Sequence, residues 1–140
     1  MDRNIKREII LDNYQNPFHR GISDDSYIKI NTNNESCIDN LDIYFKVEND
    51  TIVDVSFEGE ACAISTSATS IMLKNIIGKT LTEVKELIKN YKNMIDEKEY
   101  DEKILKELNC YDTIALQPNR KTCALLPVKA IEKLLKQYEK

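Results

Sequence analysis

The sequence lacks an apolar run long enough to span a bilayer, which takes about 20 consecutive apolar residues. It also lacks an excess of positive charge, because 20 Lys and Arg residues stand against 24 Asp and Glu residues with both signs interspersed. The first absence argues against a membrane protein, and the second argues against a nucleic-acid binder. We therefore expect a protein partner instead of a polyanion.

The first residues, MDRNIKREIILDNYQNP, lack the apolar block of a signal peptide. We therefore expect a cytoplasmic protein. The sequence also lacks paired C-x-x-C motifs, and its four cysteines, Cys37, Cys62, Cys110 and Cys123, lie far apart. Cytosolic thiols are kept reduced, so metal binding or thiol chemistry is favoured over disulfide bonds.

The chain of 140 residues is long enough for one compact domain and too short for two comfortable ones. We predict a single domain over residues 1–140. Apolar periodicity predicts a helix from Arg3 to Tyr14, a short strand near Ile28, and a hairpin over 41–57 interrupted at Asn49-Asp50. Further helices are predicted over 64–77, 81–96, 98–108 and 122–138, the last with Pro127 in its first turns and a loop before it.

This order of elements, one helix, two or three strands and then several helices, predicts an α+β domain. We expect a small antiparallel sheet of about three strands with helices packed on one face. Gly78 follows one helix as a left-handed cap residue, and Thr80 with Glu83 forms a capping-box pattern for the next. The charged run KELIKNYKNMIDEKEYDEK is interpreted as solvated helix faces.

Candidate metal ligands stand at the ends of predicted elements. Cys37 and Asp39 precede the hairpin, Cys62 follows it, and Cys123 opens the predicted last helix. A hairpin brings the chain back to where it began, so Cys37 and Cys62 can meet. Thiolates and a carboxylate are suitable zinc ligands. From spacing alone, however, buried apolar cysteines explain the pattern equally well.

A resemblance to a known family changes this balance. The segments DNYQNPFHRG, SCID, FEGEACAISTSATSIM and RKTCALLPVKAIEKLL resemble, in order, the blocks of the SufU/IscU family, whose domain is also found at the N-terminus of NifU. The resemblance implies the SufE/NifU-like fold. It also implies a surface site that holds zinc or carries a nascent iron–sulfur cluster, with Cys37, Asp39, Cys62 and Cys123 as ligands.

The resemblance further implies separate roles for these residues. Cys37 would be the catalytic sulfur acceptor, whereas Cys62 and Cys123 would be anchored ligands at helix starts, where the dipole favours a thiolate. Three thiolates, one carboxylate and a divalent ion sum to about −2. Arg120 matches a basic residue of the family block and would supply a supporting charge near the site.

Two features bear on the branch of the family. Thr122 stands before the last ligand cysteine, where scaffold members usually have histidine and the zinc-bearing SufU members usually have lysine, so this residue matches neither branch. Cys123 lies 61 positions after Cys62, which leaves room for the extra helical segment typical of SufU-like proteins. We therefore predict a zinc-dependent sulfurtransferase in iron–sulfur cluster assembly. His19 is interpreted as a solvated loop residue, and Cys110 as a spectator or resolving thiol.

In the implied mechanism, a pyridoxal-phosphate (PLP) cysteine desulfurase of the SufS type carries a persulfide, and the Cys37 thiolate attacks its outer sulfur. By resemblance, a histidine of the desulfurase replaces Cys37 on the metal, so docking activates the acceptor. The sulfur would pass to a downstream iron–sulfur scaffold complex. Two alternatives stay open: an iron–sulfur cluster assembly scaffold that is not an enzyme, and a structural zinc domain.

Overall fold

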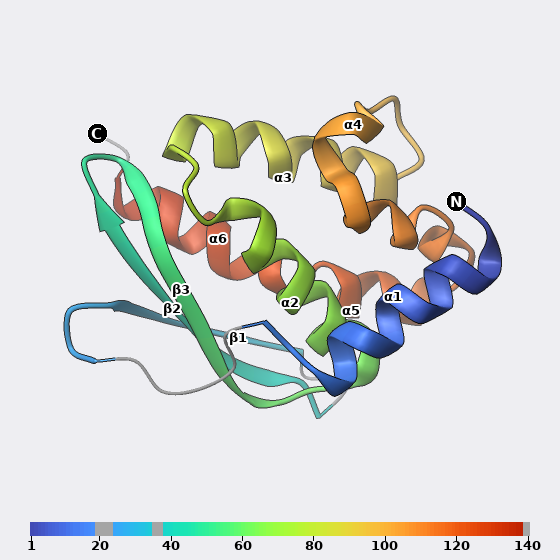
Figure 1. The fold of residues 1–140 in the computed structure, drawn as a ribbon, viewed down its shortest axis with the longest axis horizontal. Helices are drawn as coiled ribbons and strands as arrows, with labels where there is room; N and C mark the ends of the chain where they lie inside the picture. Colours follow the sequence, from blue (N-terminus) through green and yellow to red (C-terminus); the bar gives the residue numbers. More distant parts are fainter. Residues whose placement is uncertain (19–23, 35–37, 139–140) are drawn as a thin grey trace.

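A three-stranded antiparallel sheet forms one layer of the computed structural model, which describes residues 1–18, 24–34 and 38–138 (Figure 1). The strand order is β1-β2-β3, so each strand pairs with its neighbour along the chain. Such a sheet needs only short connections between its strands. The strands are β1 (Ile28–Asn33), β2 (Asn40–Glu48) and β3 (Thr51–Glu60).

The turn between β2 and β3 lies where the sequence predicted it. Asn49 and Asp50 have φ angles of 52° and 59°. Two left-handed residues in succession are the signature of a type I′ turn, whose twist matches that of the flanking strands. Asn and Asp tolerate this conformation better than most residues. The predicted hairpin is therefore confirmed.

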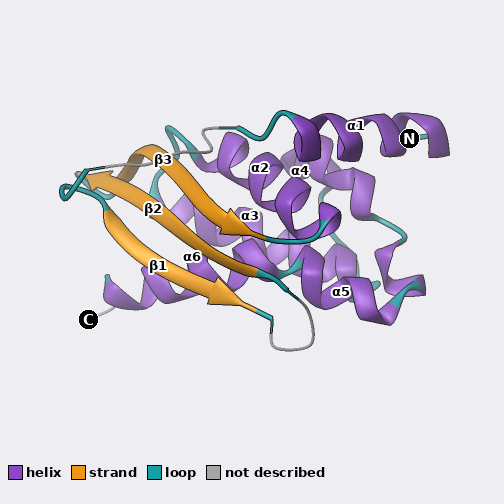
Figure 2. Ribbon diagram, turned by 90° about the horizontal axis from the view of Figure 1, so that it is seen from below, coloured by secondary structure: helices purple, strands orange, loops and turns teal. Residues whose placement is uncertain are grey.

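One face of the sheet is buried. Leu41, Ile43 and Phe45 of β2 and Val55 and Phe57 of β3 are fully shielded from solvent. These residues alternate with more exposed ones, as expected for strands packed on one side only. Figure 2 shows the helices covering one face of the sheet. The predicted α+β class, with three antiparallel strands and helices on one face, is confirmed.

The helices pack against the sheet and against one another, and one cluster of buried apolar side chains draws on both layers. They comprise α1 (Arg3–Gln15), α2 (Ala63–Ile76), α3 (Leu81–Ile95), α4 (Glu102–Leu105), α5 (Pro118–Ala124) and α6 (Leu126–Gln137), with 3₁₀ turns η1 (Lys106–Tyr111) and η2 (Ile114–Leu116).

Helix α2 lies at the centre of the molecule, in contact with β3, α1, α5 and α6. Its hydroxyl side chains are buried, which is tolerated because each finds a hydrogen-bond partner. Ser70, for example, donates to Asn13 of α1 across 2.8 Å and accepts from the Phe18 amide at 2.8 Å. These bonds fix α1 on α2.

The predicted helix boundaries around Gly78 are confirmed. Helix α2 ends at Ile76, and Gly78 adopts a left-handed φ of 83°. The Thr80 side chain accepts from the Glu83 amide and the Glu83 carboxylate accepts from the Thr80 amide, so the capping box predicted for α3 is present.

The single helix predicted over 122–138 is wrong, because the structure has two helices separated at Leu125. Pro127 has no amide hydrogen to donate, and its ring would clash with the carbonyl of Cys123 in a continuous helix. Pro127 instead occupies the first turn of α6, where an amide is not required. Cys123 consequently lies in the last turn of α5, and its predicted place at a helix start is also wrong.

The helix predicted over 98–108 is shorter than expected. Asp101 caps α4 by accepting from the Lys103 amide, so the helix begins at Glu102. Lys106 has a left-handed φ of 48°, which ends α4 and leads into η1. The predicted loop after it contains the end of η1, η2 and the first residues of α5.

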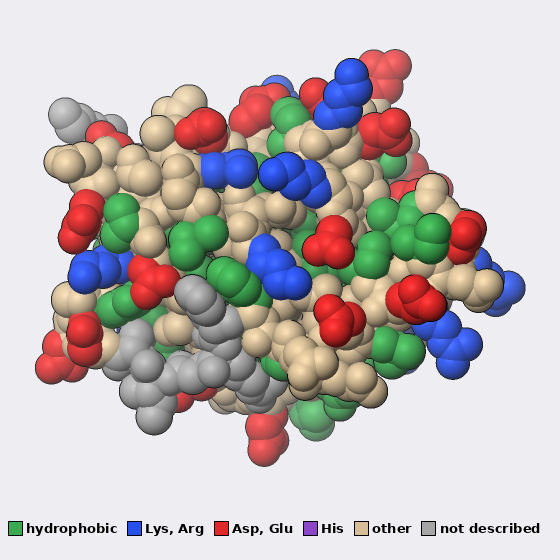
Figure 3. Space-filling view, viewed as in Figure 1, with side chains coloured by type: hydrophobic (Ala, Val, Ile, Leu, Met, Phe, Trp, Pro, Cys, Tyr) green, Lys and Arg blue, Asp and Glu red, His purple; other side chains and the backbone are tan. Residues whose placement is uncertain are grey.

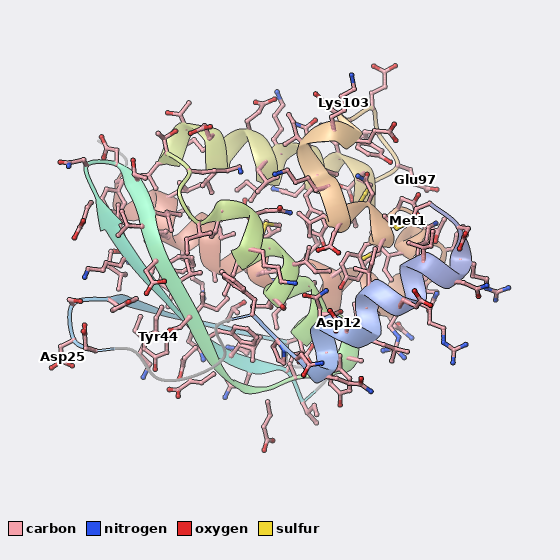
Figure 4. All side chains as sticks on the ribbon, in the orientation of Figure 1. Met1, Asp12, Asp25, Tyr44, Glu97 and Lys103 are labelled. Carbon is pink, nitrogen blue, oxygen red and sulfur yellow. The ribbon has the colours of Figure 1, made fainter. Side chains whose placement is uncertain are left out.

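The surface mixes charges of both signs. Acidic and basic side chains are interspersed over the face in Figure 3, as the composition predicted. On the outer face of the sheet, Tyr44 donates to Glu58 at 2.6 Å. Figure 4 shows Tyr44 on the sheet and Lys103 on α4, on opposite sides of the molecule. Among the residues that the structure describes, no helix has the length and apolar character needed to cross a bilayer.

Candidate metal site

Cys62 is the N-cap residue of α2, as the sequence predicted. Its backbone is extended, with φ −68° and ψ 170°, and its Sγ accepts from the Ser65 amide at 3.4 Å. Strand β3 ends two residues earlier, so Cys62 stands between strand and helix. The first amides of a helix have no partners within it, and they favour an electron-rich atom at this position.

Asp39 meets Cys62 because of the strand register. Asn40, the first residue of β2, pairs with Glu60, the last residue of β3, so the residues just outside both strands face each other. The Cys62 amide donates to Asp39 Oδ1 at 2.7 Å, and the Cys62 Sγ lies 3.9 Å from Asp39 Oδ2. The residues just before and just after the hairpin therefore lie at one end of the sheet, as expected. The predicted meeting of Cys37 and Cys62 stays a prediction, because Cys37 lies outside the described residues.

Asp39 is buried, with 2% of its surface exposed, and both of its carboxylate oxygens accept hydrogen bonds. Its Oδ2 accepts from the Ser65 hydroxyl at 2.5 Å. Burial acts to raise the pKa of Asp39, but hydrogen bonds from Ser65, from the Cys62 amide and from the Cys123 and Cys62 thiols outweigh it, and the pKa lies below its usual value. The side chain is therefore an anion at neutral pH.

Cys123 reaches the same place from the end of α5. Its thiol is buried, with the Asn119 carbonyl oxygen 3.7 Å and the Asn34 side-chain nitrogen 4.0 Å from Sγ. Burial raises the pKa of Cys123 to about 12, and the hydrogen bond with the Cys62 thiol is the second largest cause. This thiol keeps its proton at neutral pH unless a cation replaces it.

The three side chains converge. One ligand atom from each of Asp39, Cys62 and Cys123 lies within 4.8 Å of the others. In a tetrahedral zinc site, with Zn–S near 2.3 Å and Zn–O near 2.0 Å, neighbouring ligand atoms are about 3.5–3.8 Å apart. Small side-chain movements would therefore bring the three atoms to coordination distance, so two thiols and a carboxylate fit a divalent ion of this kind.

The other residues singled out in the sequence lie outside this group of three side chains or outside the described residues. Cys37 and His19 lie outside the described residues, so their predicted roles stay predictions. Arg120 is exposed on α5, and its role as a supporting charge also stays a prediction. Cys110 is buried in η1, and burial raises the pKa of its thiol to about 12, which agrees with the interpretation as a spectator.

Two residues that the sequence analysis did not select support the site. Ser65 joins Asp39 to Cys62, and its position three residues after the helix cap was the available signal. Tyr91 of α3 donates to the Ala124 carbonyl at 2.7 Å, next to Cys123. No local pattern marks this second contact, because it joins residues 33 positions apart.

Comparison with known proteins identifies relatives over nearly the whole length. Residues 5–140 match the model of the NifU-like N-terminal domain. The chain is 35% identical over 130 residues to the zinc-dependent sulfurtransferase SufU of Bacillus subtilis, covering 92% of this chain and 88% of that protein. It is 34% identical over 133 residues to the iron–sulfur cluster assembly scaffold protein IscU of Thermotoga maritima, covering 95% and 94%.

A solved structure shares the fold. FiSufU from Fervidobacterium islandicum AW-1, described as a candidate iron–sulfur cluster assembly scaffold protein for the SUF system, superposes with a TM-score of 0.86. Its sequence is 36% identical, and the match covers 94% of this chain and 97% of that one. The resemblance to SufU and IscU inferred from the sequence is confirmed, and the chain belongs to the NifU-like N-terminal domain family.

Proposed function

We propose that the chain is a zinc-dependent sulfurtransferase of cytoplasmic iron–sulfur cluster assembly. In this proposal Cys37 accepts sulfur from a persulfide on a PLP-dependent cysteine desulfurase. The observation that carries the proposal is the convergence of Asp39, Cys62 and Cys123 within 4.8 Å. The relative named as a zinc-dependent sulfurtransferase, which is 35% identical, supports the choice of zinc and of the activity.

The donor set suits zinc, with Cys37 proposed as the fourth ligand. Zinc binds thiolate sulfur and carboxylate oxygen in a tetrahedron, and when bound it keeps cysteine ligands deprotonated at neutral pH. Calcium and magnesium prefer sites made of oxygen alone, so the two thiols argue against them. Asp39 is the hardest donor of the set, and a mixed site of this kind opens more readily than one of four cysteines.

The sulfur transfer itself needs no outside oxidant. The Cys37 thiolate attacks the outer sulfur of the persulfide, a new S–S bond forms on Cys37, and the desulfurase cysteine leaves as a thiolate. One S–S bond forms as another breaks, so the number of electrons is unchanged. Asp39, Cys62 and Cys123 would stay in place as the anchored side of the site, while Cys37 exchanges between metal and substrate.

A second function is favoured by the other relatives. A scaffold would use the same side chains to build an iron–sulfur cluster, and the Thermotoga maritima relative at 34% identity is named as such a scaffold. A site of two thiols and a carboxylate suits iron as well as zinc. Both functions belong to iron–sulfur cluster assembly, and they differ in whether the chain turns over sulfur.

The test begins with metal and sulfide analysis of the purified full chain. Its effect on the rate of alanine production by a SufS-type cysteine desulfurase is then measured. We expect tightly bound zinc and a large stimulation that Cys37→Ser abolishes. Cys110→Ala is the matched control, because this buried cysteine lies outside the site, and it should keep the stimulation.

Three outcomes would contradict the proposal. Bound iron with labile sulfide would favour the scaffold. Zinc without stimulation would reject sulfur transfer from this desulfurase. Stimulation that survives Cys37→Ser would reject Cys37 as the acceptor.

A further inference from the structure

Ser65 occupies an unusual position among the buried hydroxyls of α2. Its side chain is fully buried, and it donates to Asp39 Oδ2 at 2.5 Å. The Cys62 thiol donates back to the Ser65 hydroxyl at 3.4 Å, and the Ser65 amide donates to Cys62 Sγ at the same distance. Ser65 therefore contacts Asp39 and Cys62, and a hydrogen bond also links its hydroxyl to the Cys123 thiol.

Serine and threonine within a helix commonly donate to a carbonyl one turn earlier. Two hydroxyls of α2 do so, since Ser67 donates to the Ile64 carbonyl and Thr69 to that of Ser65. Thr66 also donates to a backbone carbonyl, that of Ala61 five residues earlier. The Ser65 hydroxyl points out of the helix to a carboxylate instead. Because a hydroxyl has one proton to donate, this bond uses its whole donor capacity.

We propose that Ser65 is a positioning residue that fixes the Asp39 carboxylate as a metal ligand. The inference rests on the proposed metal site, and it adds a role for a residue that is not itself a ligand. Two bonds hold the carboxylate: the Cys62 amide holds Oδ1 at 2.7 Å, and the Ser65 hydroxyl holds Oδ2. Both donors belong to the first turn of α2, so the helix start sets the plane of the carboxylate.

This arrangement leaves one oxygen facing the thiols. Oδ2 lies 3.9 Å from the Cys62 Sγ, and an ionised carboxylate oxygen has a second lone pair beyond the one that Ser65 uses. Without the hydroxyl, Oδ1 alone would be held, and the carboxylate could rotate about that contact. Loss of such an outer hydrogen bond typically lowers metal affinity about 10- to 100-fold.

The test compares Ser65→Ala with Ser67→Ala in the full chain. Ser67 is the matched control because it is also fully buried and lies two residues along the same helix, but it bonds to the Ile64 carbonyl and to Tyr111 instead of to Asp39. Zinc affinity is measured by competition with a chromophoric chelator, and unfolding in urea is measured without metal. We expect both variants to lose similar stability, whereas only Ser65→Ala lowers zinc affinity, by about 10- to 100-fold.

A cycle with Asp39→Ala then tests whether Ser65 acts through that carboxylate. If it does, Ser65→Ala lowers affinity in the wild-type background and has little further effect once Asp39 is alanine. Ser65→Thr, which keeps a hydroxyl, should retain affinity. Equal zinc affinity for Ser65→Ala and Ser67→Ala would overturn the role of Ser65. The same would follow if Ser65→Ala lowered zinc affinity as much in the Asp39→Ala background as in the wild type. A wild-type chain that binds no zinc, or an Asp39→Ala chain that binds it normally, would overturn the proposed metal site itself.

Discussion

Removal of the Tyr91 hydroxyl is the most direct test of how the end of α5 is held. Tyr91 is fully buried on α3, and its hydroxyl donates to the Ala124 carbonyl at 2.7 Å, one residue after Cys123. This carbonyl lies at the break before Leu125, where the regular hydrogen bonds of the helix stop. Tyr91→Phe keeps the ring and its edge-to-face contact with Tyr111, with centroids 6.4 Å apart, and removes one atom.

The expected loss of stability follows from the acceptor left behind. A buried carbonyl without its partner costs about 1–3 kcal/mol, and the lost ring contacts add little because the ring stays. For a chain of this size, each kcal/mol corresponds to roughly 4 °C in melting temperature. Urea unfolding of the metal-free protein should therefore show a lower midpoint with an unchanged slope.

Tyr138→Phe provides the control, since Tyr138 is 39% exposed at the C-terminal end of α6. We expect that change to stay within about 0.5 kcal/mol. If Tyr91→Phe were equally harmless, the hydroxyl would not be holding the end of α5, and the account of how Cys123 is positioned would be refuted.

Three further changes have definite expected outcomes. Gly59→Ala should lower the free energy of unfolding in urea by about 3 kcal/mol, because its φ is 122° and the new Cβ would lie 2.3 Å from a backbone oxygen of β2. Gly78→Ala is the control: its φ is 83° but the space around it is open, so the loss should be about 1 kcal/mol. Burial raises the pKa of Cys110 from 9.0 to about 12, so the unfolded chain loses this proton first and the free energy of unfolding falls as pH rises between those values. In urea unfolding measured across this pH range, Cys110→Ala should make the fall of stability with pH less steep by about 1.4 kcal/mol per pH unit. Thr80→Ala removes the cap that accepts from the Glu83 amide and should cost about 1 kcal/mol in thermal unfolding.

Local chemistry explains why the sheet and the first part of the site were predictable. The hairpin follows from the alternation of apolar and polar residues and from Asn49-Asp50, which suit a left-handed turn. A hairpin with known ends then brings the residues before and after it together, which is how Asp39 meets Cys62. Each inference needed only neighbouring residues and one rule of strand pairing.

The parts that were mispredicted depend on competition between local and distant effects. Periodicity continues through Pro127, so the pattern alone did not show that the missing amide divides the segment into α5 and α6. The hydroxyl of Ser65 could have bonded within its helix, as that of Ser67 does. Its choice of Asp39 depends on where the hairpin ends, and that is settled only when helix and sheet are both in place.

The relation between the core and the candidate site bears on the remaining alternative, a structural zinc domain. Such a domain depends on its metal for folding, because its own core is too small. Here the buried cluster runs through the sheet, α2, α3 and α6, and it includes large side chains such as Phe45, Phe57 and Leu87. Asp39 and Cys62 lie at the end of the sheet, and hydrogen bonds within the protein already join them. We therefore expect a strong chelator to lower the melting temperature while leaving a cooperative transition and unchanged far-ultraviolet circular dichroism. Unfolding on chelation at 25 °C would show instead that the metal holds the fold together, and the site would then be structural.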